Sequence, residues 1–259
     1  MPEGLEAEIW RRASEPLVGR TIAEVIVDDR VVADGFVATV TGATIEGARR
    51  RGKILLVDTD RATIGLHFGM TGRLIVDGVA PIEQLAYSSG RDDPTWDRLV
   101  ISTEPGGRGS PPALRFNDPR RLGRVSIDPD LGHLGVDYAV VTPKRLASAL
   151  DGRHGVLKSV LLDQSVVAGL GNLCVDEVLW WAGLDPRRPA DSLSAPEIER
   201  LAVAIRRRLP IMLSRGGSTE GVLNPSVRAT CPPCERDGTP LERVVIGGRT
   251  TVWCRAHQR

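Results

Sequence analysis

Residues 162–172 read Leu-Asp-Gln-Ser-Val-Val-Ala-Gly-Leu-Gly-Asn, an apolar run that stops at a Gly-x-Gly-Asn turn. We interpret the run as helical and the following segment 175–181 as the start of a second helix. Glycines let the backbone turn tightly, and exposed amides at a helix start bind anions. The turn therefore predicts a phosphate site to which Asn172 adds a side-chain donor. The alternative is a plain helix C-cap, the usual role of Gly-rich breaks between helices.

The whole string at 162–172 resembles the helix-two-turn-helix element of the formamidopyrimidine-DNA glycosylase and endonuclease VIII family, which binds the phosphates beside a damaged nucleotide. That family works with an N-terminal proline as nucleophile and a glutamate directly behind it. This chain begins Met1-Pro2-Glu3, and we expect removal of Met1 to leave Pro2 with a free secondary amine. Many unrelated proteins begin with the same residues, so an ordinary solvated terminus is the alternative.

The resemblance implies a reaction for these two residues. An α-amino group titrates at about pH 8, so part of the Pro2 amine is neutral at physiological pH. That amine can attack the sugar C1′ and give an iminium ion joined to the DNA, after which the base leaves. Glu3 would act as a general acid on the sugar ring oxygen and then carry protons in the β,δ-elimination that cuts the strand.

The bulk composition fits two domains plus a small appendage, because the chain has 259 residues, of which 41% are hydrophobic. A net charge of +1 does not indicate a DNA partner. Arginines do cluster at 49–53, at 120–124 and in the tail 228–259, although one such cluster is more often a solvated face. No apolar stretch approaches the ~20 residues of a membrane span, and no signal peptide is visible. We expect a monomer in the bacterial cytoplasm, associated with the nucleoid.

Three of the four cysteines lie in the tail, as Cys231-Pro-Pro-Cys234 and Cys254, and His257 follows at ligand spacing. Two such corners are typical of a zinc ribbon, in which a structural Zn²⁺ replaces a core. The predicted ligands are Cys231, Cys234, Cys254 and His257. A disulfide between Cys231 and Cys234 is the alternative, but it leaves Cys254 and His257 unexplained. The family usually has four cysteines here, so His257 is a departure.

The first half has the pattern of a β-sandwich, because short apolar runs are punctuated by Gly, Pro and Asp. A helix at 6–12 precedes the expected strands, which cover residues 21–27, 54–58, 62–67, 73–77, 99–102, 113–117 and 123–127. Helical runs follow at 144–150, 156–162, 175–182 and 195–213. The predicted class is α+β, with a β-sandwich domain at 1–140, a helix-two-turn-helix domain at 141–225 and a zinc ribbon at 226–259.

Residues 244–246 and 250–253 predict two strands joined by a tight turn at Gly247-Gly248. In the family, an arginine after such glycines contacts the phosphate on the far side of the extruded nucleotide, and Arg249 matches that position. A guanidinium can bind two phosphate oxygens at once. A solvent-exposed hairpin arginine is the alternative.

Three first-half motifs carry further roles that the resemblance implies. In the motif 50–56, Lys53 matches a lysine that touches a backbone phosphate and helps excise oxidised purines. In the motif 67–72, His67 would bind phosphate and Met70 would fill the hole left by the flipped nucleotide. In the motif 116–123, Arg120 would read the opposite base and Leu122 would act as a second wedge. Leu122 replaces the usual aromatic residue and cannot stack as a ring would.

Substrate choice rests on another departure from the family. Only a short segment separates Gly216-Gly217 from Cys231, which leaves no room for the long loop that caps flipped 8-oxoguanine in one branch. Ring-opened purines or oxidised pyrimidines are the better expectation. The predicted function is a base-excision repair DNA glycosylase and abasic-site lyase acting on double-stranded DNA, with no redox or nucleotide cofactor. The alternatives are a catalytically silent binder of damaged or abasic DNA and a zinc-ribbon RNA or ribosome-associated module.

Overall fold

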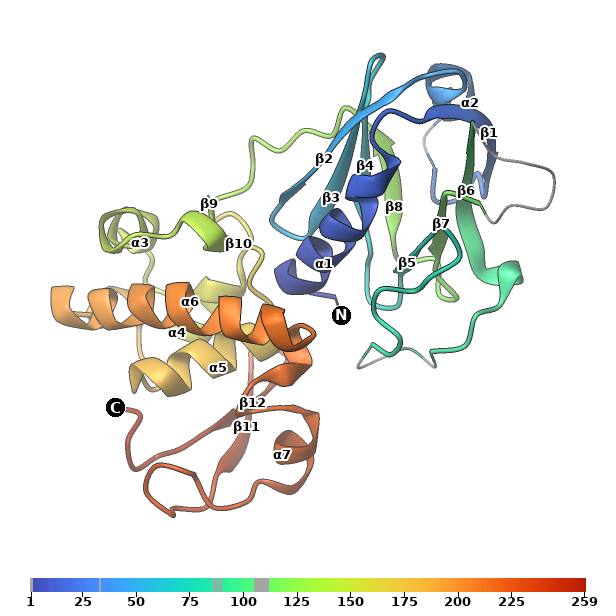
Figure 1. The fold of residues 1–259 in the computed structure, drawn as a ribbon. Helices are drawn as coiled ribbons and strands as arrows, with labels where there is room; N and C mark the ends of the chain where they lie inside the picture. The colour runs from blue at the N-terminus through green and yellow to red at the C-terminus, as the bar shows by residue number, and fades with distance from the viewer. Residues whose placement is uncertain (1, 33, 86–87, 89, 105–111) are drawn as a thin grey trace. The chain divides into compact units, whose positions relative to one another are not determined.

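The computed structural model describes residues 2–32, 34–85, 88, 90–104 and 112–259. The chain divides into two compact units (Figure 1). The first contains Pro2 and Glu6–Leu131, and the second contains Glu3–Leu5 and Gly132–Arg259. The short segment Glu3–Leu5 therefore belongs with the helical half of the chain. The three-part division at residues 140 and 225 stays a prediction.

The first unit consists of two four-stranded antiparallel sheets, in agreement with the predicted β-sandwich. One sheet has the order β1 (Thr21–Val27), β6 (Asp97–Glu104), β7 (Leu114–Asn117) and β5 (Arg73–Val76). The other has the order β2 (Ile45–Arg51), β3 (Ile54–Thr59), β4 (Thr63–His67) and β8 (Arg124–Ile127). Side chains from both sheets share one buried apolar cluster. The unit also has a short helix, α2 (Phe36–Val40).

The leading helix α1 (Gly4–Ser14) packs on this core through Trp10, whose ring centroid lies 3.8 Å from that of Phe68. Strand β2 was not among the predicted strands, because its run of arginines hides the alternation typical of a strand. In the structure Arg49 pairs with Asp58 across the β2–β3 hairpin at 2.7 Å. Part of this basic cluster is therefore neutralised within its own sheet.

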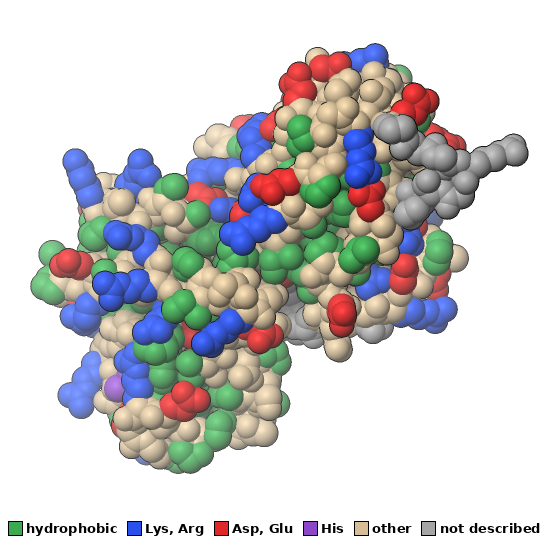
Figure 2. Space-filling view, in the orientation of Figure 1, with side chains coloured by type: hydrophobic (Ala, Val, Ile, Leu, Met, Phe, Trp, Pro, Cys, Tyr) green, Lys and Arg blue, Asp and Glu red, His purple; other side chains and the backbone are tan. Residues whose placement is uncertain are grey.

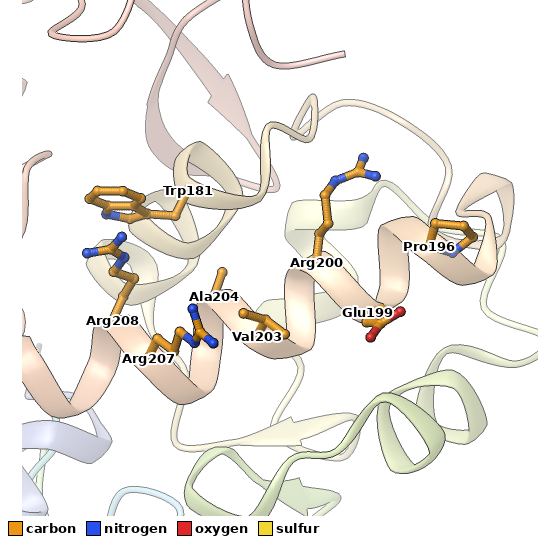
Figure 3. A pocket seen from close by; sticks show the side chains of 8 residues that line it. All are labelled: Trp181, Pro196, Glu199, Arg200, Val203, Ala204, Arg207 and Arg208. Carbon is orange, nitrogen blue, oxygen red and sulfur yellow. The ribbon is translucent and has the colours of Figure 1, made fainter.

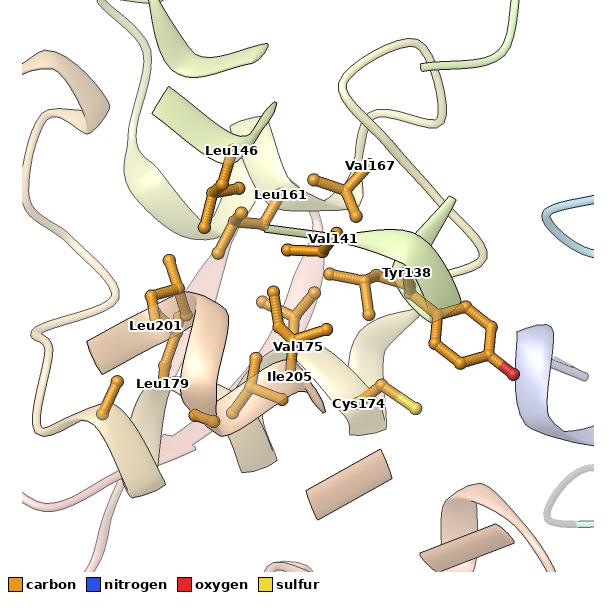
Figure 4. Packing of buried hydrophobic residues seen from close by; sticks show 14 of the residues in the cluster. Tyr138, Val141, Leu146, Leu161, Val167, Cys174, Val175, Leu179, Leu201 and Ile205 are labelled. Carbon is orange, nitrogen blue, oxygen red and sulfur yellow. The ribbon is translucent and has the colours of Figure 1, made fainter. Parts of the chain in front are cut away.

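The second unit is helical. It comprises α3 (Pro143–Leu150), α4 (Leu157–Leu162), α5 (Asn172–Ala182), α6 (Ala195–Arg215) and α7 (Pro225–Thr230). Helix α6 begins at a capping box formed by Ser194 and Glu197. Nearly all of α5 is buried, and side chains such as Val175, Leu179 and Ile205 fill the core between α5 and α6 (Figure 4). Among the described residues, no helix is long and apolar enough to cross a membrane.

The helical interpretation of the run at 162–172 was wrong beyond its first residue, because α4 ends at Leu162. Val167–Ala168 instead forms the short strand β10, which pairs in parallel with β9 (Val136–Asp137). The Gln164 side chain donates to the carbonyls of Leu162 and Leu170 at 2.9 Å each, and it accepts from the amide of Gly169 at 2.9 Å. A glutamine amide can hold a double turn in this way, because it both donates and accepts.

The tail forms the predicted hairpin of β11 (Glu242–Ile246) and β12 (Arg249–Trp253). Gly247 and Gly248 have φ values of 54° and 71°, as a two-residue type I′ turn requires. Val252 of β12 and Trp180 of α5 lie in one small buried cluster with Cys234 and Cys254. The hairpin is therefore packed on the helix that begins at the Gly-x-Gly-Asn turn.

Candidate active site and nucleic-acid interface

The carboxylate of Glu3 lies at the N-terminal end of α5. It accepts hydrogen bonds from the backbone amides of Gly171 at 2.9 Å, Leu173 at 2.8 Å and Cys174 at 3.1 Å. Only 2% of the surface of Glu3 is exposed to solvent. A carboxylate is favoured here because free amides and the helix dipole give the start of a helix a partial positive charge. The neighbouring Gly4 adds an amide bond to the carbonyl of Gly169 at 2.8 Å.

This arrangement corrects one expectation. The amides of the Gly-x-Gly-Asn turn were predicted to bind phosphate, but the amides of Gly171, Leu173 and Cys174 around the start of α5 are bonded to Glu3 instead. Gly171 is needed for the same reason, because a Cβ on this residue would lie 2.3 Å from the Cδ of Glu3. The turn does bind an anion, and that anion is the chain's own carboxylate. Pro2, directly before Glu3, is buried.

Asn172 and Arg249 are brought close together within the second unit. The Asn172 amide donates to the carbonyl of Thr250 at 3.0 Å, next to Arg249 in the chain. The hairpin tip is also close to α4, since a Cβ on Gly247 would lie 2.7 Å from the Oγ of Ser159. Arg249 itself is exposed. The second hydrogen of the Asn172 amide and the Arg249 guanidinium are suited to bind neighbouring phosphate oxygens.

A buried charge network holds β12 against the helices. Lys158 of α4 is fully buried, and its ammonium lies 2.7 Å from Asp176 of α5. The other carboxylate oxygen of Asp176 pairs with Arg228 at 2.5 Å and accepts from the amide of Val252 at 3.1 Å. Lys158 and Arg228 both donate to the carbonyl of Thr250, at 3.1 and 2.6 Å. These contacts fix the strand that carries Arg249.

Sequence reasoning missed this network. Its signal was a lone lysine in the apolar helical run at 156–162, where burial demands a charged partner. Burial lowers the pKa of Lys158, and the negative charge of Asp176 opposes that shift. The ammonium therefore depends on Asp176 to stay charged inside the protein.

In the first unit, His67 lies at the end of β4, near the cations Lys53 and Arg124. Burial lowers its pKa, and the positive charges of Lys53 and Arg124 lower it further. The amide of Gly69 donates to Nδ1 of His67 at 3.3 Å, which leaves the proton of the neutral ring on Nε2. Arg124 pairs with His67 across strands β4 and β8. Two cationic side chains and one neutral N–H donor thus lie near one another, and both types of side chain can bind a phosphate oxygen.

Asp118 is fully buried and joins the loops at 67–72 and 116–123, which carry the predicted wedge residues Met70 and Leu122. One oxygen accepts from the Thr71 hydroxyl at 2.5 Å, and the other accepts from the amides of Leu122 and Gly123 at 2.8 Å each. Leu122 is 44% exposed, and Met70 is half-buried. Asp118 was not singled out from the sequence, although an Asp before Pro is a frequent turn residue.

The amide of Arg120 also donates to Asp118, at 3.2 Å, while the residue itself is exposed. A Cβ on Gly69 would lie 2.4 Å from the carbonyl carbon of Leu122, so the two loops touch at this glycine. Met70, Arg120 and Leu122 are thus carried by one rigid pair of loops. Their roles on DNA stay predictions.

Four possible metal ligands lie together in the tail. One ligand atom from each of Cys234, Asp237, Cys254 and His257 falls within 4.8 Å of the others. Cys231 was predicted as a ligand but is not in this group. It ends α7 at a φ of 48°, and its Sγ lies 3.9 Å from the carbonyl of Arg228. Asp237, which the Cys and His spacing could not indicate, lies beside the other three donors instead, and Cys231 as a ligand stays a prediction.

The chemistry of these donors fits zinc, because two thiols and an imidazole are its usual ligands. His257 is also bonded on its far side, with Nε2 lying 3.2 Å from the carbonyl of Trp180. Such an outer contact fixes the orientation of a ligating ring. All four cysteines are free, so the predicted alternative of a disulfide between Cys231 and Cys234 is not formed.

Comparison with known proteins gives two family matches that together cover most of the chain. The model of the formamidopyrimidine-DNA glycosylase N-terminal domain matches residues 1–125. The model of the formamidopyrimidine-DNA glycosylase H2TH domain matches residues 134–222. The two matches meet near the boundary between the two structural units.

Relatives with similar sequences match along nearly their whole length. A formamidopyrimidine-DNA glycosylase of Paracoccus denitrificans (strain Pd 1222) is 35% identical, with 98% of both chains covered. Another, of Geobacillus kaustophilus (strain HTA426), is 33% identical, with 100% of both chains covered.

Two solved structures have the same fold over nearly their whole length. The MutM (Fpg) protein of Thermus thermophilus has a TM-score of 0.80 and 31% identity, covering 99% of this chain and 98% of that one. The Fpg of Lactococcus lactis, solved with DNA that contains an abasic site, has a TM-score of 0.80 and 25% identity, covering 99% of both chains.

Proposed function

We propose, from the premise that this chain belongs to the formamidopyrimidine-DNA glycosylase family, that it removes damaged bases from double-stranded DNA and then cuts the strand at the abasic site. The observation that supports this most directly is the attachment of Glu3 to the start of α5. Three backbone amides hold a carboxylate one residue after the proposed nucleophile. Catalytic groups act best when they are held in one geometry before substrate binds.

The proposed reaction uses only groups of the protein and the DNA. The neutral amine of Pro2 forms a bond to C1′ while the bond from C1′ to the base breaks, and the base leaves as an anion that takes a proton from water. The Glu3 carboxylate accepts the proton that the Pro2 nitrogen gives up and passes it to the ring oxygen as the sugar opens to the iminium form. Successive β and δ elimination then expel the 3′ and 5′ phosphates. Hydrolysis of the iminium returns the Pro2 amine.

The DNA would be bound by groups in each unit. In the first unit we assign Lys53 and His67 to phosphates. In the second we assign Asn172 and Arg249 to the phosphates beside the lesion. Flipping out a nucleotide leaves a hole and costs a few kcal/mol of lost stacking and pairing, which inserted side chains partly offset. Met70, Arg120 and Leu122 are the proposed replacements.

We further propose that the substrates are ring-opened purines and oxidised pyrimidines rather than 8-oxoguanine. Support comes from the short segment between Gly217 and Cys231. It is already folded, as a 3₁₀ turn at Ser218–Glu220 and helix α7, and the amide of Leu223 is bonded to Glu177 of α5 at 2.9 Å. Because most residues of this segment take part in the turn, the helix or these hydrogen bonds, few are free to cap a base.

The proposed metal is one structural Zn²⁺, held by Cys234, Cys254 and His257 together with Asp237. Bound there, it would stabilise the hairpin that presents Arg249, and it takes no part in the chemistry. Its absence would therefore weaken DNA binding before it changed the chemical step.

Duplexes with a single defined lesion test the proposal. We expect the purified protein to cut duplexes that carry a formamidopyrimidine or an oxidised pyrimidine faster than one that carries 8-oxoguanine. Equal or faster cutting at 8-oxoguanine would contradict the assigned lesion class. Binding to all of these duplexes without cutting any would leave a silent binder of damaged DNA as the function.

A further inference from the structure

A pocket of about 460 Å³ lies along the side of α6, away from the Gly-x-Gly-Asn turn. Val203 and Ala204 of α6 line its middle, and Trp181 of α5 closes one end (Figure 3). Arg208 stands beside that indole, and Arg207 lines the pocket nearer Ala204. The pocket thus combines an apolar floor, an aromatic wall and a basic rim. Lys and Arg side chains are frequent on the visible surface of this unit (Figure 2).

The basic rim has little negative charge to balance it. The guanidinium of Arg208 lies 3.1 Å from the centre of the Trp181 ring, and that of Arg236 lies 4.8 Å from it. Within the described part of the chain, neither Arg207 nor Arg208 is paired with a carboxylate. The acidic side chain that lines the pocket is Glu199, which is exposed.

The buried carboxylate of Glu177 is already hydrogen-bonded within the protein. Glu177 accepts from the Trp181 ring nitrogen at 2.8 Å and from the amides of Val222 and Leu223 at 3.0 and 2.9 Å. Burial lowers the pKa of Arg208, and the positive charges of Arg236 and Arg207 act in the same direction, while Glu177 opposes them only in part. The pocket is therefore a site of largely uncompensated positive charge.

We propose that this pocket docks an acidic segment of a partner protein, with an aromatic or large aliphatic side chain placed between its carboxylates. A guanidinium binds a carboxylate through two parallel hydrogen bonds. An apolar floor beside a tryptophan gives the accompanying side chain a place to be buried. Tryptophan and arginine are also the residues that most often dominate binding at protein interfaces.

Nucleic acid fits the pocket less well. A phosphate backbone supplies negative charge, but it has no side chain to cover the floor at Val203 and Ala204. The proposed phosphate contact Asn172 begins α5, whereas Trp181 lies near its other end, about 13 Å further along the helix axis. The pocket and the proposed DNA contact therefore lie at opposite ends of one helix.

Fluorescence anisotropy with the full chain tests the proposal. The probe is a labelled peptide, Asp-Glu-Asp-Phe-Asp-Glu-Leu-Asp, and two control peptides replace either its acids by Asn and Gln or its Phe and Leu by Ser. We expect saturable binding of the probe and affinity at least tenfold lower for both controls. The double variant Arg207→Ala/Arg208→Ala should lose at least tenfold in affinity for the probe, while Arg206→Ala, a neighbouring exposed arginine outside the pocket, should bind it normally.

Cleavage of abasic duplex DNA should stay unchanged in the double variant, and its thermal unfolding should match that of the parent chain. Failure of the probe to saturate would overturn the proposal. Equal binding of either control peptide, or equal weakening by Arg206→Ala, would show that binding depends only on nonspecific positive charge. Either result would also overturn the proposal. If undamaged duplex DNA displaces the probe and the double variant weakens DNA binding instead, the pocket is a nucleic-acid contact and the proposal is wrong.

Discussion

The backbone amide of Gly171 donates to the carboxylate of Glu3 at 2.9 Å, although 168 positions separate the two residues in the chain. A Cβ at position 171 would lie 2.3 Å from the Cδ of Glu3 and 2.6 Å from its Oε1. A side chain at 171 and the observed position of Glu3 are therefore incompatible. The second glycine of the Gly-x-Gly-Asn turn is explained by the chain's own N-terminus.

Gly171→Ala should displace Glu3 and slow strand cleavage at an abasic site at least tenfold, equivalent to about 1.4 kcal/mol in the activation barrier. Single-turnover cleavage rates measure the effect. Gly47→Ala is the matched control, because a Cβ there meets nothing closer than an Asp58 oxygen at 3.9 Å. A normal rate in Gly171→Ala would show that the contact has no catalytic importance.

Lys158→Met should lower the free energy of unfolding by about 3 kcal/mol, because it removes one of the buried charges that compensate Asp176. Chemical denaturation gives the value. Lys144→Met, at an exposed position of α3, should change stability by no more than about 0.5 kcal/mol. Equal effects of the two substitutions would mean that the buried network adds nothing specific to stability.

The lowered pKa of His67 predicts a pH dependence of stability. As pH falls below the ordinary value of 6.5, the unfolded chain takes up a proton before the folded chain does, so the unfolded state gains stability. The stability associated with neutral His67 is therefore fully present above pH 6.5 and is lost as pH falls below it. Denaturation in urea at about pH 7.5 and 5.5 should show a smaller decrease for His67→Gln than for the parent chain.

His133→Gln removes an exposed histidine and serves as the control for this comparison. Its decrease between the two pH values should match that of the parent chain. If His67→Gln also matched the parent chain, the depressed pKa would be refuted.

Cys254→Ser should remove a bound zinc ion and lower the unfolding temperature, since structural zinc sites supply folding free energy directly. Metal analysis of the purified protein measures the zinc content. Cys174→Ala changes a buried cysteine outside the cluster and should keep one zinc ion per chain. Full zinc occupancy in Cys254→Ser would exclude this cysteine as a ligand.

The sequence predicted the elements whose pattern is set locally. The expected helix at 195–213 is observed as Ala195–Arg215, and the strand expected at 21–27 is observed as Thr21–Val27. The missed strand Ile45–Arg51 is held by pairing with β3 and by the ion pair from Arg49 to Asp58, neither of which the alternation of residues 45–51 alone shows.

In the candidate site too, the sequence showed what is set locally and missed what depends on distant contacts. The motifs named Glu3, Lys53, His67 and Asn172, but each motif describes residues that are close in the chain. The roles of Asp118 and Asp237 depend on partners brought together by folding, such as Thr71 for Asp118 and Cys254 for Asp237. Glu3 is the clearest case, since its hydrogen bonds to α5 occupy amides that looked free for a ligand in the sequence.

Covalent trapping on DNA tests the proposed chemistry most directly. The purified protein would be incubated with a duplex that contains one abasic site in the presence of borohydride, with mass spectrometry to confirm that Met1 is absent. We expect a covalent adduct on the Pro2 nitrogen, slower trapping with Pro2→Gly because its primary amine is not the native proline nitrogen, and slower trapping with Glu3→Gln. Tight binding of the duplex by the chain lacking Met1, with neither adduct nor strand cleavage, would contradict the lyase mechanism and leave a binder of damaged DNA.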